Sequence, residues 1–130
     1  MTDDFVPPRV FKTAWFTKAA ARVRIGDDEL CTAIAEVMNG QADDLGGGVV
    51  KKRLNRNWHR SLVLAKGGRN WIYAYLFAKK ERANIDTSEL EDFRLLAKSY
   101  AAMSPQQLRQ LIEYKDLLEI CHGAKASLQK

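Results

Sequence analysis

The longest apolar segment of the chain is the eight-residue run Trp71–Ala78, and it constrains the fold more than any other feature. Its aromatic and β-branched residues are bounded by turn residues, which is typical of a β-strand. Successive side chains of a strand point to opposite faces, so an unbroken apolar run needs an apolar layer on both faces. We therefore predict a central strand over Asn70–Lys79, covered on both sides. The run is also too short to span a membrane, which takes about 20 apolar residues.

Four further segments have the character of strands. Val49–Leu54 and Ser61–Lys66 are rich in Val and Leu and are bounded by turn residues. Gly67-Gly68 accepts positive φ and predicts a hairpin between Ser61–Lys66 and the central strand Asn70–Lys79. Arg9–Lys12 is a short candidate, and Leu117–Cys121 is expected to form a late edge strand. These segments predict an antiparallel sheet.

Two stretches with helical spacing of apolar residues lie between the first strand and the others. Thr13 is placed to cap a helix that runs to Ile25, where Gly26 ends it. Asp27 is expected to cap a second helix that ends at Asn39-Gly40. The pair is predicted to form an N-terminal helical hairpin.

Two more helices are expected after the strands. Ser88 with Glu91, three residues on, matches a capping box. Ser104-Pro105 with Gln107 repeats that signal for a shorter helix. The order predicts an α+β fold, with the helical hairpin and the C-terminal helices packed on a small sheet.

Length and composition favour one domain. The chain has 130 residues and a formal charge of +5, within the usual size of a single domain. We expect a flexible arm over residues 1–8, one domain over 9–122 and a flexible tail over 123–130.

Cys31 and Cys121 are far apart and in no CxxC pair, so reduced core thiols in a cytoplasmic protein are expected. Cys121-His122 has no second ligand pair at metal spacing, so no metal site is expected.

Positive charge is concentrated in about a quarter of the chain. Residues 49–82 hold ten cations against the single acid Glu81, together with five of the twelve aromatic residues. Phosphates need cations and exposed bases need flat faces to stack on, so this composition indicates a polyanion surface. Solvated strand ends with ordinary core aromatics are the alternative. The ten cations are Lys51, Lys52, Arg53, Arg56, Arg60, Lys66, Arg69, Lys79, Lys80 and Arg82.

Three sequence pieces are familiar in combination. They are Arg-Val-Phe-Lys-Thr (9–13) followed by Trp-Phe, Leu-Gly-Gly-Gly-Val (45–49) running into Lys-Lys-Arg (51–53), and Phe-Ala-Lys-Lys-Glu-Arg-Ala-Asn-Ile (77–85). Over residues 9–121 the chain resembles the RelE/HigB-like toxins of bacterial type II toxin–antitoxin systems. The resemblance implies a twisted antiparallel sheet and a ribosome-dependent mRNA endoribonuclease that needs no metal or other cofactor. It also implies a cognate antitoxin with a DNA-binding helix-turn-helix, so that operator DNA is contacted only through the antitoxin.

The chain departs from the family pattern at three places. Many relatives have a longer loop where this chain has Asn-Arg-Asn-Trp-His (55–59). Lys80 stands where relatives often have Ser, and where better-studied members have an arginine that contributes to cleavage. Lys80 therefore matches that arginine in charge but not in geometry. A substrate-stacking tyrosine of some relatives has no clear counterpart.

RNA cleavage by internal attack needs a group that takes the 2′-hydroxyl proton, a group that neutralises the transition state and a proton donor for the leaving 5′-oxygen. Cations can supply all three, because crowding lowers the pKa of a lysine. We predict a catalytic set of Lys51, Arg53, Arg60 and Lys80. Strand alternation places Lys51 and Arg53 on one face and Lys52 on the other. Each of the four is otherwise a positioning or solvated cation.

Six further residues are predicted to bind RNA: Lys52, Arg56, Trp58, His59, Lys79 and Arg82. Histidine is a common general base, so His59 could act as one, but its loop position favours a surface stacking role. Arg82 fits either an orienting role at the site or an ion pair. Tyr73 and Tyr75 could stack a nucleotide, although their strand favours core packing.

Two other functions fit the same resemblance. A ParE-like toxin would share the fold and inhibit DNA gyrase without cleaving RNA. A non-catalytic RNA-binding relative would retain RNA and have no growth phenotype. The dense basic block favours the nuclease, whose partners would be the ribosome, mRNA and the antitoxin, with no membrane partner.

Overall fold

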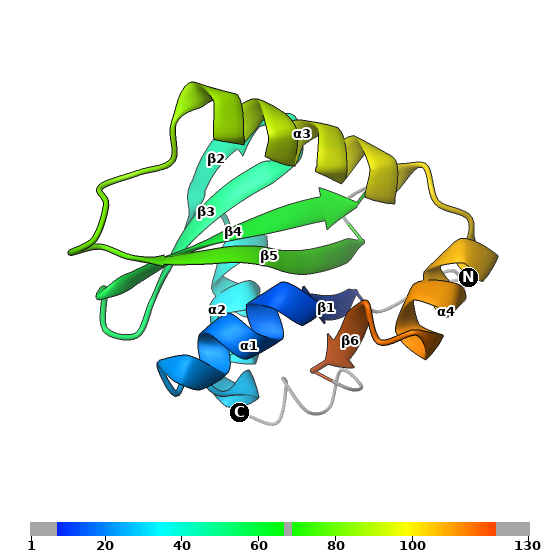
Figure 1. Cartoon of the computed structure of the whole chain (residues 1–130), viewed down its shortest axis with the longest axis horizontal. Coiled ribbons are helices and arrows are strands. Elements are labelled where there is room, and N and C mark those ends of the chain that lie inside the picture. Colours follow the sequence, from blue (N-terminus) through cyan, green and yellow to red (C-terminus); the bar gives the residue numbers. More distant parts are fainter. Residues whose placement is uncertain (1–7, 67–68, 122–130) are drawn as a thin grey trace.

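The computed structural model describes residues 8–66 and 69–121 (Figure 1). The predicted arm, apart from Pro8, the predicted tail and the Gly67-Gly68 turn lie outside the described residues. The element order is β1 (Arg9–Thr13), α1 (Ala14–Arg22), α2 (Asp27–Met38), β2 (Asp43–Gly46), β3 (Val49–Leu54), β4 (His59–Lys66), β5 (Asn70–Ala78), α3 (Thr87–Ala101), α4 (Pro105–Glu113) and β6 (Leu117–Ile120).

One six-stranded sheet runs through the molecule in the order β2-β3-β4-β5-β1-β6. The α+β class is confirmed, but the predicted all-antiparallel sheet is wrong, because β1 pairs parallel with β5 and the sheet is mixed. Only hairpins force antiparallel pairing, and the long connection between β1 and β5, which contains α1, α2 and three strands, permits the parallel arrangement. The sequence also gave no sign of β2, whose Asp-Asp-Leu-Gly lacks strand composition.

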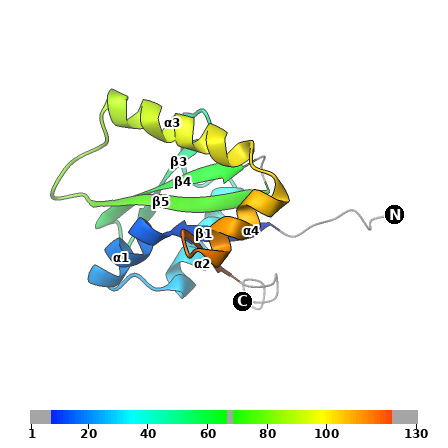
Figure 2. The same cartoon turned by 45° about the vertical axis from the view of Figure 1, so that its right-hand side comes forward.

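Helices cover both faces of the sheet, as Figure 2 shows with α3 on one side and α1 and α2 on the other. The core under α1 and α2 contains Phe16, Leu30 and Tyr73. The core under α3 and α4 contains Leu62 and Ile72. Neighbouring residues of β5 thus enter different cores, which confirms the predicted central strand covered on both sides.

The two helices after β1 are present and share one core. Thr13 caps α1 as predicted, since its Oγ1 accepts the Phe16 N–H at 3.0 Å. Gly26, not Asp27, occupies the N-cap position of α2. The predicted N-terminal helical hairpin is not confirmed as a unit, because a strand precedes the helices and they pack on different strands, α1 on β5 and α2 on β3.

Capping boxes begin both helices on the other face. In α4 the predicted box is confirmed, with Ser104 and Gln107 bonding to each other's backbone N–H groups. In α3 the box is formed by Asp86 and Glu89, so the predicted Ser88–Glu91 pairing is wrong. Both pairs have the three-residue spacing, and the chain takes the earlier one.

Cys31 and Cys121 form a disulfide that joins α2 to the residue after β6, with the Cα atoms 5.6 Å apart. The prediction of two reduced core thiols is therefore wrong. Their 90-residue separation in sequence gave no information on their distance in space, which is set by the pairing of β6 with β1.

No helix within residues 8–66 and 69–121 has the length and apolar character needed to cross a bilayer.

Candidate nucleic-acid interface

The β3–β4 hairpin places three cations on one face of the sheet. Arg53 pairs directly with Arg60, which confirms their predicted position across the hairpin. Lys51 lies two residues before Arg53, opposite Leu62, whose side chain belongs to the core under α3. Because residues two apart on a strand share a face, all three cations lie on the α3 side. We call Lys51, Arg53 and Arg60 the basic face.

The opposed pair of arginines has no counter-charge within the described chain. Arg53 is exposed, and no carboxylate of residues 8–66 and 69–121 forms an ion pair with it or with Arg60. Arg60 Nη1 instead donates to the carbonyl oxygens of Asn57 at 3.0 Å and His59 at 3.3 Å. Like charges directly opposite each other across strands are destabilising, so this pair favours a bound anion.

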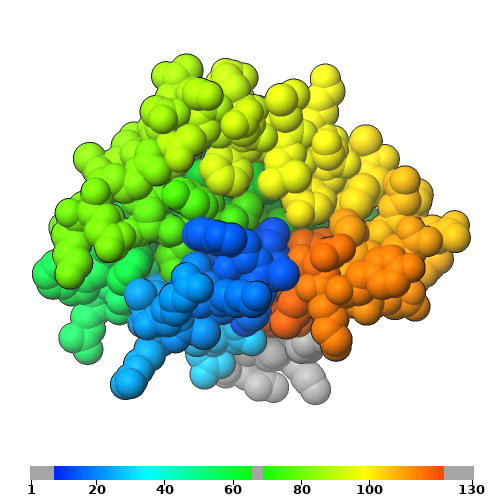
Figure 3. Space-filling model, viewed as in Figure 1, coloured from blue at the N-terminus to red at the C-terminus, as the bar shows by residue number. Residues whose placement is uncertain are grey.

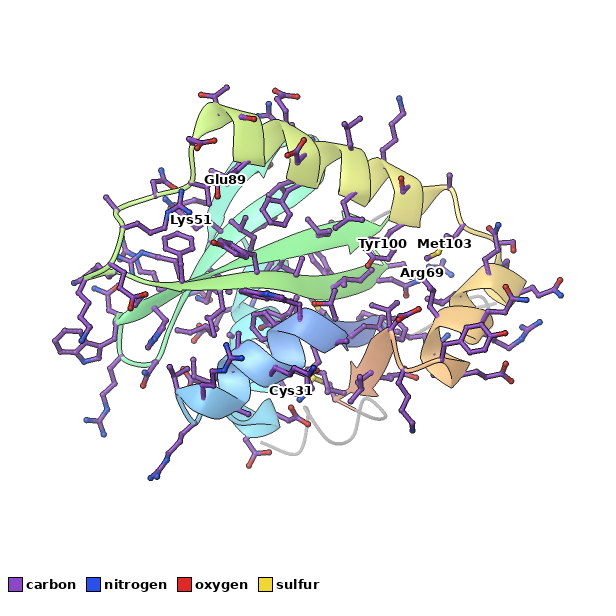
Figure 4. The ribbon with its side chains drawn as sticks, viewed as in Figure 1. Cys31, Lys51, Arg69, Glu89, Tyr100 and Met103 are labelled. Atoms are coloured by element: carbon purple, nitrogen blue, oxygen red, sulfur yellow. A yellow bond between two sulfur atoms is a disulfide. The ribbon has the colours of Figure 1, made fainter. Side chains whose placement is uncertain are left out.

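Lys51 is largely enclosed, with its side chain 16% exposed. Its Nζ lies 3.4 Å from Asn84 Oδ1 and 3.9 Å from Asp43 Oδ2. Figure 4 shows Lys51 and Glu89 on the same side of the sheet, between β3 and the start of α3. Lys51 is therefore held beside the segment that joins β5 to α3.

Arg82 lies on that same segment and is paired with a carboxylate. Its Nη1 donates to Glu89 Oε2 at 3.0 Å, its Nε to Asn84 O at 2.9 Å, and its guanidinium lies 5.7 Å over the Phe77 ring. Hydrogen bonds from Arg82 hold the pKa of Glu89 below its usual value, and those same bonds raise the pKa of Arg82. Asn84 contacts both Arg82 and Lys51, so it joins them into one cluster.

Two predicted site residues lie away from the basic face. Lys52 points to the opposite side of the sheet, where its Nζ lies 2.7 Å from Glu36 Oε1 on α2 and donates to Gln41 O at 3.0 Å. Lys80, which follows β5, lines a cavity beside α1. The structure therefore brings Lys51, Arg53 and Arg60 together but not Lys80.

The loop of the β3–β4 hairpin contains three successive left-handed residues, Asn55, Arg56 and Asn57, with φ of 54°, 53° and 73°. Asn tolerates this region through local hydrogen bonding, whereas Arg does not. The carboxylate of Glu29 on α2 accepts the Asn55 N–H and holds the loop in place. Arg56 is exposed at its tip.

Trp58 and His59 follow this loop at the start of β4. The Trp58 side chain is 57% exposed, and Lys79 Nζ lies 5.9 Å from its ring. His59 was expected in the loop but is the first residue of β4, and its Nδ1 lies 3.0 Å from Asn55 Nδ2. The three predicted RNA-binding residues Trp58, His59 and Lys79 thus lie at the same end of the sheet.

The two tyrosines of β5 have different environments. Tyr73 is fully buried, its hydroxyl donates to Leu30 O at 2.7 Å, and burial raises its pKa, so core packing is confirmed. Tyr75 is only partly buried, and Trp15 stacks on it at 5.0 Å. Phe93 of α3 also contacts Tyr75.

Sequence reasoning missed Trp15, Asn84 and Glu89 as neighbours of the site. The Asp86–Glu89 spacing was available as a capping signal, but nothing in it indicated the bond to Arg82.

Within the part of the chain that the structure describes, no group of three or more His, Cys, Asp or Glu residues could hold a metal ion.

A search of curated proteins found no match. A family model matches residues 8–120, which include every strand and helix of the structure, and it describes the RelE toxin of the RelE/RelB toxin–antitoxin system. The chain therefore belongs to the RelE toxin family and is the toxin of a toxin–antitoxin system.

Proposed function

We propose that this toxin is an endoribonuclease that cleaves mRNA on the translating ribosome and so inhibits translation. The observation that carries the proposal is the Arg53–Arg60 pair, two unneutralised like charges directly opposite each other beside Lys51. Such a pair is stabilised when an anion lies between its members, and a phosphodiester is the anion that a polyribonucleotide presents. RelE family toxins are generally ribonucleases, which supports this assignment.

The three side chains of the basic face suit different parts of the reaction. An arginine stays protonated at physiological pH, so Arg53 and Arg60 are assigned to neutralising the charge that develops on the phosphate. Lys51 is the member of the face that can exchange a proton, and we assign it to the 2′-hydroxyl. Lys51 in its neutral form takes the 2′-hydroxyl proton, and the 2′-oxygen bonds to phosphorus as the bond from phosphorus to the 5′-oxygen breaks. The departing oxygen takes a proton from water, and the hydroxide so formed recovers the proton from Lys51.

The proposal extends to partners and location. A RelE toxin has a cognate RelB-type antitoxin, and we propose that it carries a helix-turn-helix and alone contacts operator DNA. The ribosome and mRNA place the toxin in the cytoplasm. Because the cytosol keeps most thiols reduced, the Cys31–Cys121 disulfide would be absent there for most of the protein's life.

The test is cleavage of mRNA on programmed ribosomes by the purified toxin, read by mapping new RNA 5′ ends. We expect cleavage by the parent protein and a loss of about 10²–10³-fold in the Arg53→Gln and Arg60→Gln variants. Lys98→Gln, in the last turn of α3, is the matched control and should cleave normally.

One outcome would overturn the proposal, and two further observations would identify the function that replaces it. Intact mRNA with a folded parent protein rules out the nuclease. If induction of the toxin then causes DNA damage signalling, a ParE-like gyrase inhibitor replaces it. RNA retention with neither effect points to a non-catalytic RNA-binding relative.

A further inference from the structure

The cavity beside α1 that Lys80 lines is separate from the residues of the basic face. Its volume is about 620 Å³, and it opens between α1, the β3–β4 loop and the end of β5. Lys51, Arg53 and Arg60 do not line it. A volume of this size is typical of small-molecule sites, which range over ~300–1,000 Å³.

The cavity exists because β1 is shorter than β5. β1 pairs with β5 only as far as Tyr73, so the remainder of β5 has no strand beside it on that edge within the described chain. The first turns of α1 lie there instead, and Trp15 stacks on Tyr75. Figure 3 shows α1, in blue, directly against the green atoms of the neighbouring segments. The cavity therefore follows an open sheet edge.

Two half-exposed tryptophans line this cavity. Trp58 is 57% exposed and Trp15 is 50% exposed. Lys79 Nζ lies 5.9 Å from the Trp58 ring, and the ring of Tyr75 stacks on Trp15 at 5.0 Å. Indole faces that remain open in a hollow are platforms for a nucleobase, and such stacking tolerates any base sequence.

The polar groups of the cavity suit the rest of a nucleotide. Arg22 and Lys80 line it, and neither forms an ion pair with a carboxylate of residues 8–66 and 69–121. Glu81 is the acid among its described lining residues. The amide of Asn55 and the imidazole of His59, 3.0 Å apart, can bond to the edge of a base. Two open cations match the phosphates on either side of one nucleotide.

One residue, Phe77, lies between the cavity and the basic face at the edge of the sheet. Phe77 lines the cavity, pairs with Arg60 across the β4–β5 register and lies beneath the Arg82 guanidinium. A strand whose phosphate lies at Arg53 and Arg60 can therefore continue past Phe77 to the open edge of β5.

We propose that this cavity binds one unpaired base of an RNA strand, which stacks on Trp58 and Trp15 while Arg22 and Lys80 bind its phosphates. The inference rests on the proposed function, since the strand is the one held at the basic face. It gives Lys80 a binding role and adds Trp15 and Arg22 to the RNA-contacting residues.

The test compares two fluorescent single-stranded probes of about eight nucleotides, an oligouridylate and the same backbone with abasic residues. Affinities are measured by anisotropy in the Lys51→Gln background, which prevents cleavage. We expect Trp58→Leu to weaken oligouridylate binding about tenfold and to leave abasic binding unchanged. Arg22→Gln should weaken both probes, and Trp58→Phe should fall between Leu and the parent. Tyr114→Leu, which removes a 72% exposed aromatic residue after α4, is the matched control.

The reference is the Lys51→Gln protein, and the Trp58→Leu change is added to it. If both proteins bind oligouridylate equally tightly, the inference is wrong. An equal loss for both probes would also overturn it, because it assigns the contact to the backbone. Melting curves of each variant establish that it is folded. If the parent protein does not cleave mRNA on the ribosome, the proposed nuclease activity is wrong, but the binding comparison is unaffected. Failure of the proposed function and failure of this inference are therefore distinguishable.

Discussion

Arg82 binds both carboxylate oxygens of Glu89, the residue that also caps α3. Glu89 Oε1 accepts the Asp86 N–H at 2.9 Å while Arg82 Nη1 reaches Oε2 at 3.0 Å. The Glu89 carboxylate therefore completes the capping box of α3 and also binds Arg82 in the segment after β5. The segment between β5 and α3, which brings Asn84 to Lys51, is held at both ends by this carboxylate.

The first prediction concerns the pH dependence of this pair. The pKa of Glu89 is lowered from an ordinary 4.5 by hydrogen bonds from Arg82. The unfolded state therefore binds the proton first as pH falls, so the stabilisation is complete above pH 4.5 and is lost as pH drops through the lower folded value. Glu89→Gln should melt at a lower temperature than the parent near neutral pH, with the difference vanishing in acid.

Glu89→Gln separates the ion pair from the cap. A glutamine can fill the same capping position, as Gln107 does in α4. Melting temperatures of both proteins from about pH 3 to about pH 7 provide the measurement. A difference that stays constant over this range would show that the lost stability does not come from the charge of Glu89.

The second prediction concerns the stability of the Arg53–Arg60 pair. Removing either charge relieves repulsion between directly opposed strand residues, an effect of up to about 1 kcal/mol. We expect Arg53→Gln and Arg60→Gln each to unfold at equal or higher urea concentration than the parent. The double variant should gain less than the sum of the single gains. Marked destabilisation by either change would identify the arginines as structural.

The third prediction concerns Arg56, which has a φ of 53° in the hairpin loop. A left-handed conformation costs about 1–2 kcal/mol for an ordinary residue and less for asparagine. Arg56→Asn should therefore stabilise the protein by about 1 kcal/mol while weakening RNA binding and its salt dependence. Arg56→Lys keeps both the charge and the unfavourable φ, and it should resemble the parent in urea unfolding. Equal stability of the Asn and Lys variants would contradict this account.

The fourth prediction concerns the disulfide. It closes a loop with a sequence separation of 90, and the chain-entropy model gives a stabilisation of about 4–5 kcal/mol for that length. Reductant should lower the melting temperature of the parent protein, and it should have no effect on a Cys31→Ser/Cys121→Ser variant. An unchanged melting temperature after complete reduction, verified by thiol titration, would show that the bond adds no stability.

Local patterns explain which parts of the fold were predictable. The two-sided apolar run placed β5 at the centre of the sheet, and Ser104-Pro105 with Gln107 placed the start of α4. The β3–β4 hairpin fixed Arg53 opposite Arg60 because its strands are joined by a short loop. Strand alternation separated Lys52 from Lys51 for the same local reason.

By itself the sequence determined the α+β class, the buried central strand and the clustering of cations on one hairpin, because each follows from neighbouring residues. Only the tertiary structure decided the parallel β1–β5 pairing, the Cys31–Cys121 bond and the ion pair of Lys52 with Glu36. It also set Lys80 in the cavity beside α1. These features join segments far apart in the chain, and such contacts depend on how the layers pack together, which no local spacing of residue types encodes.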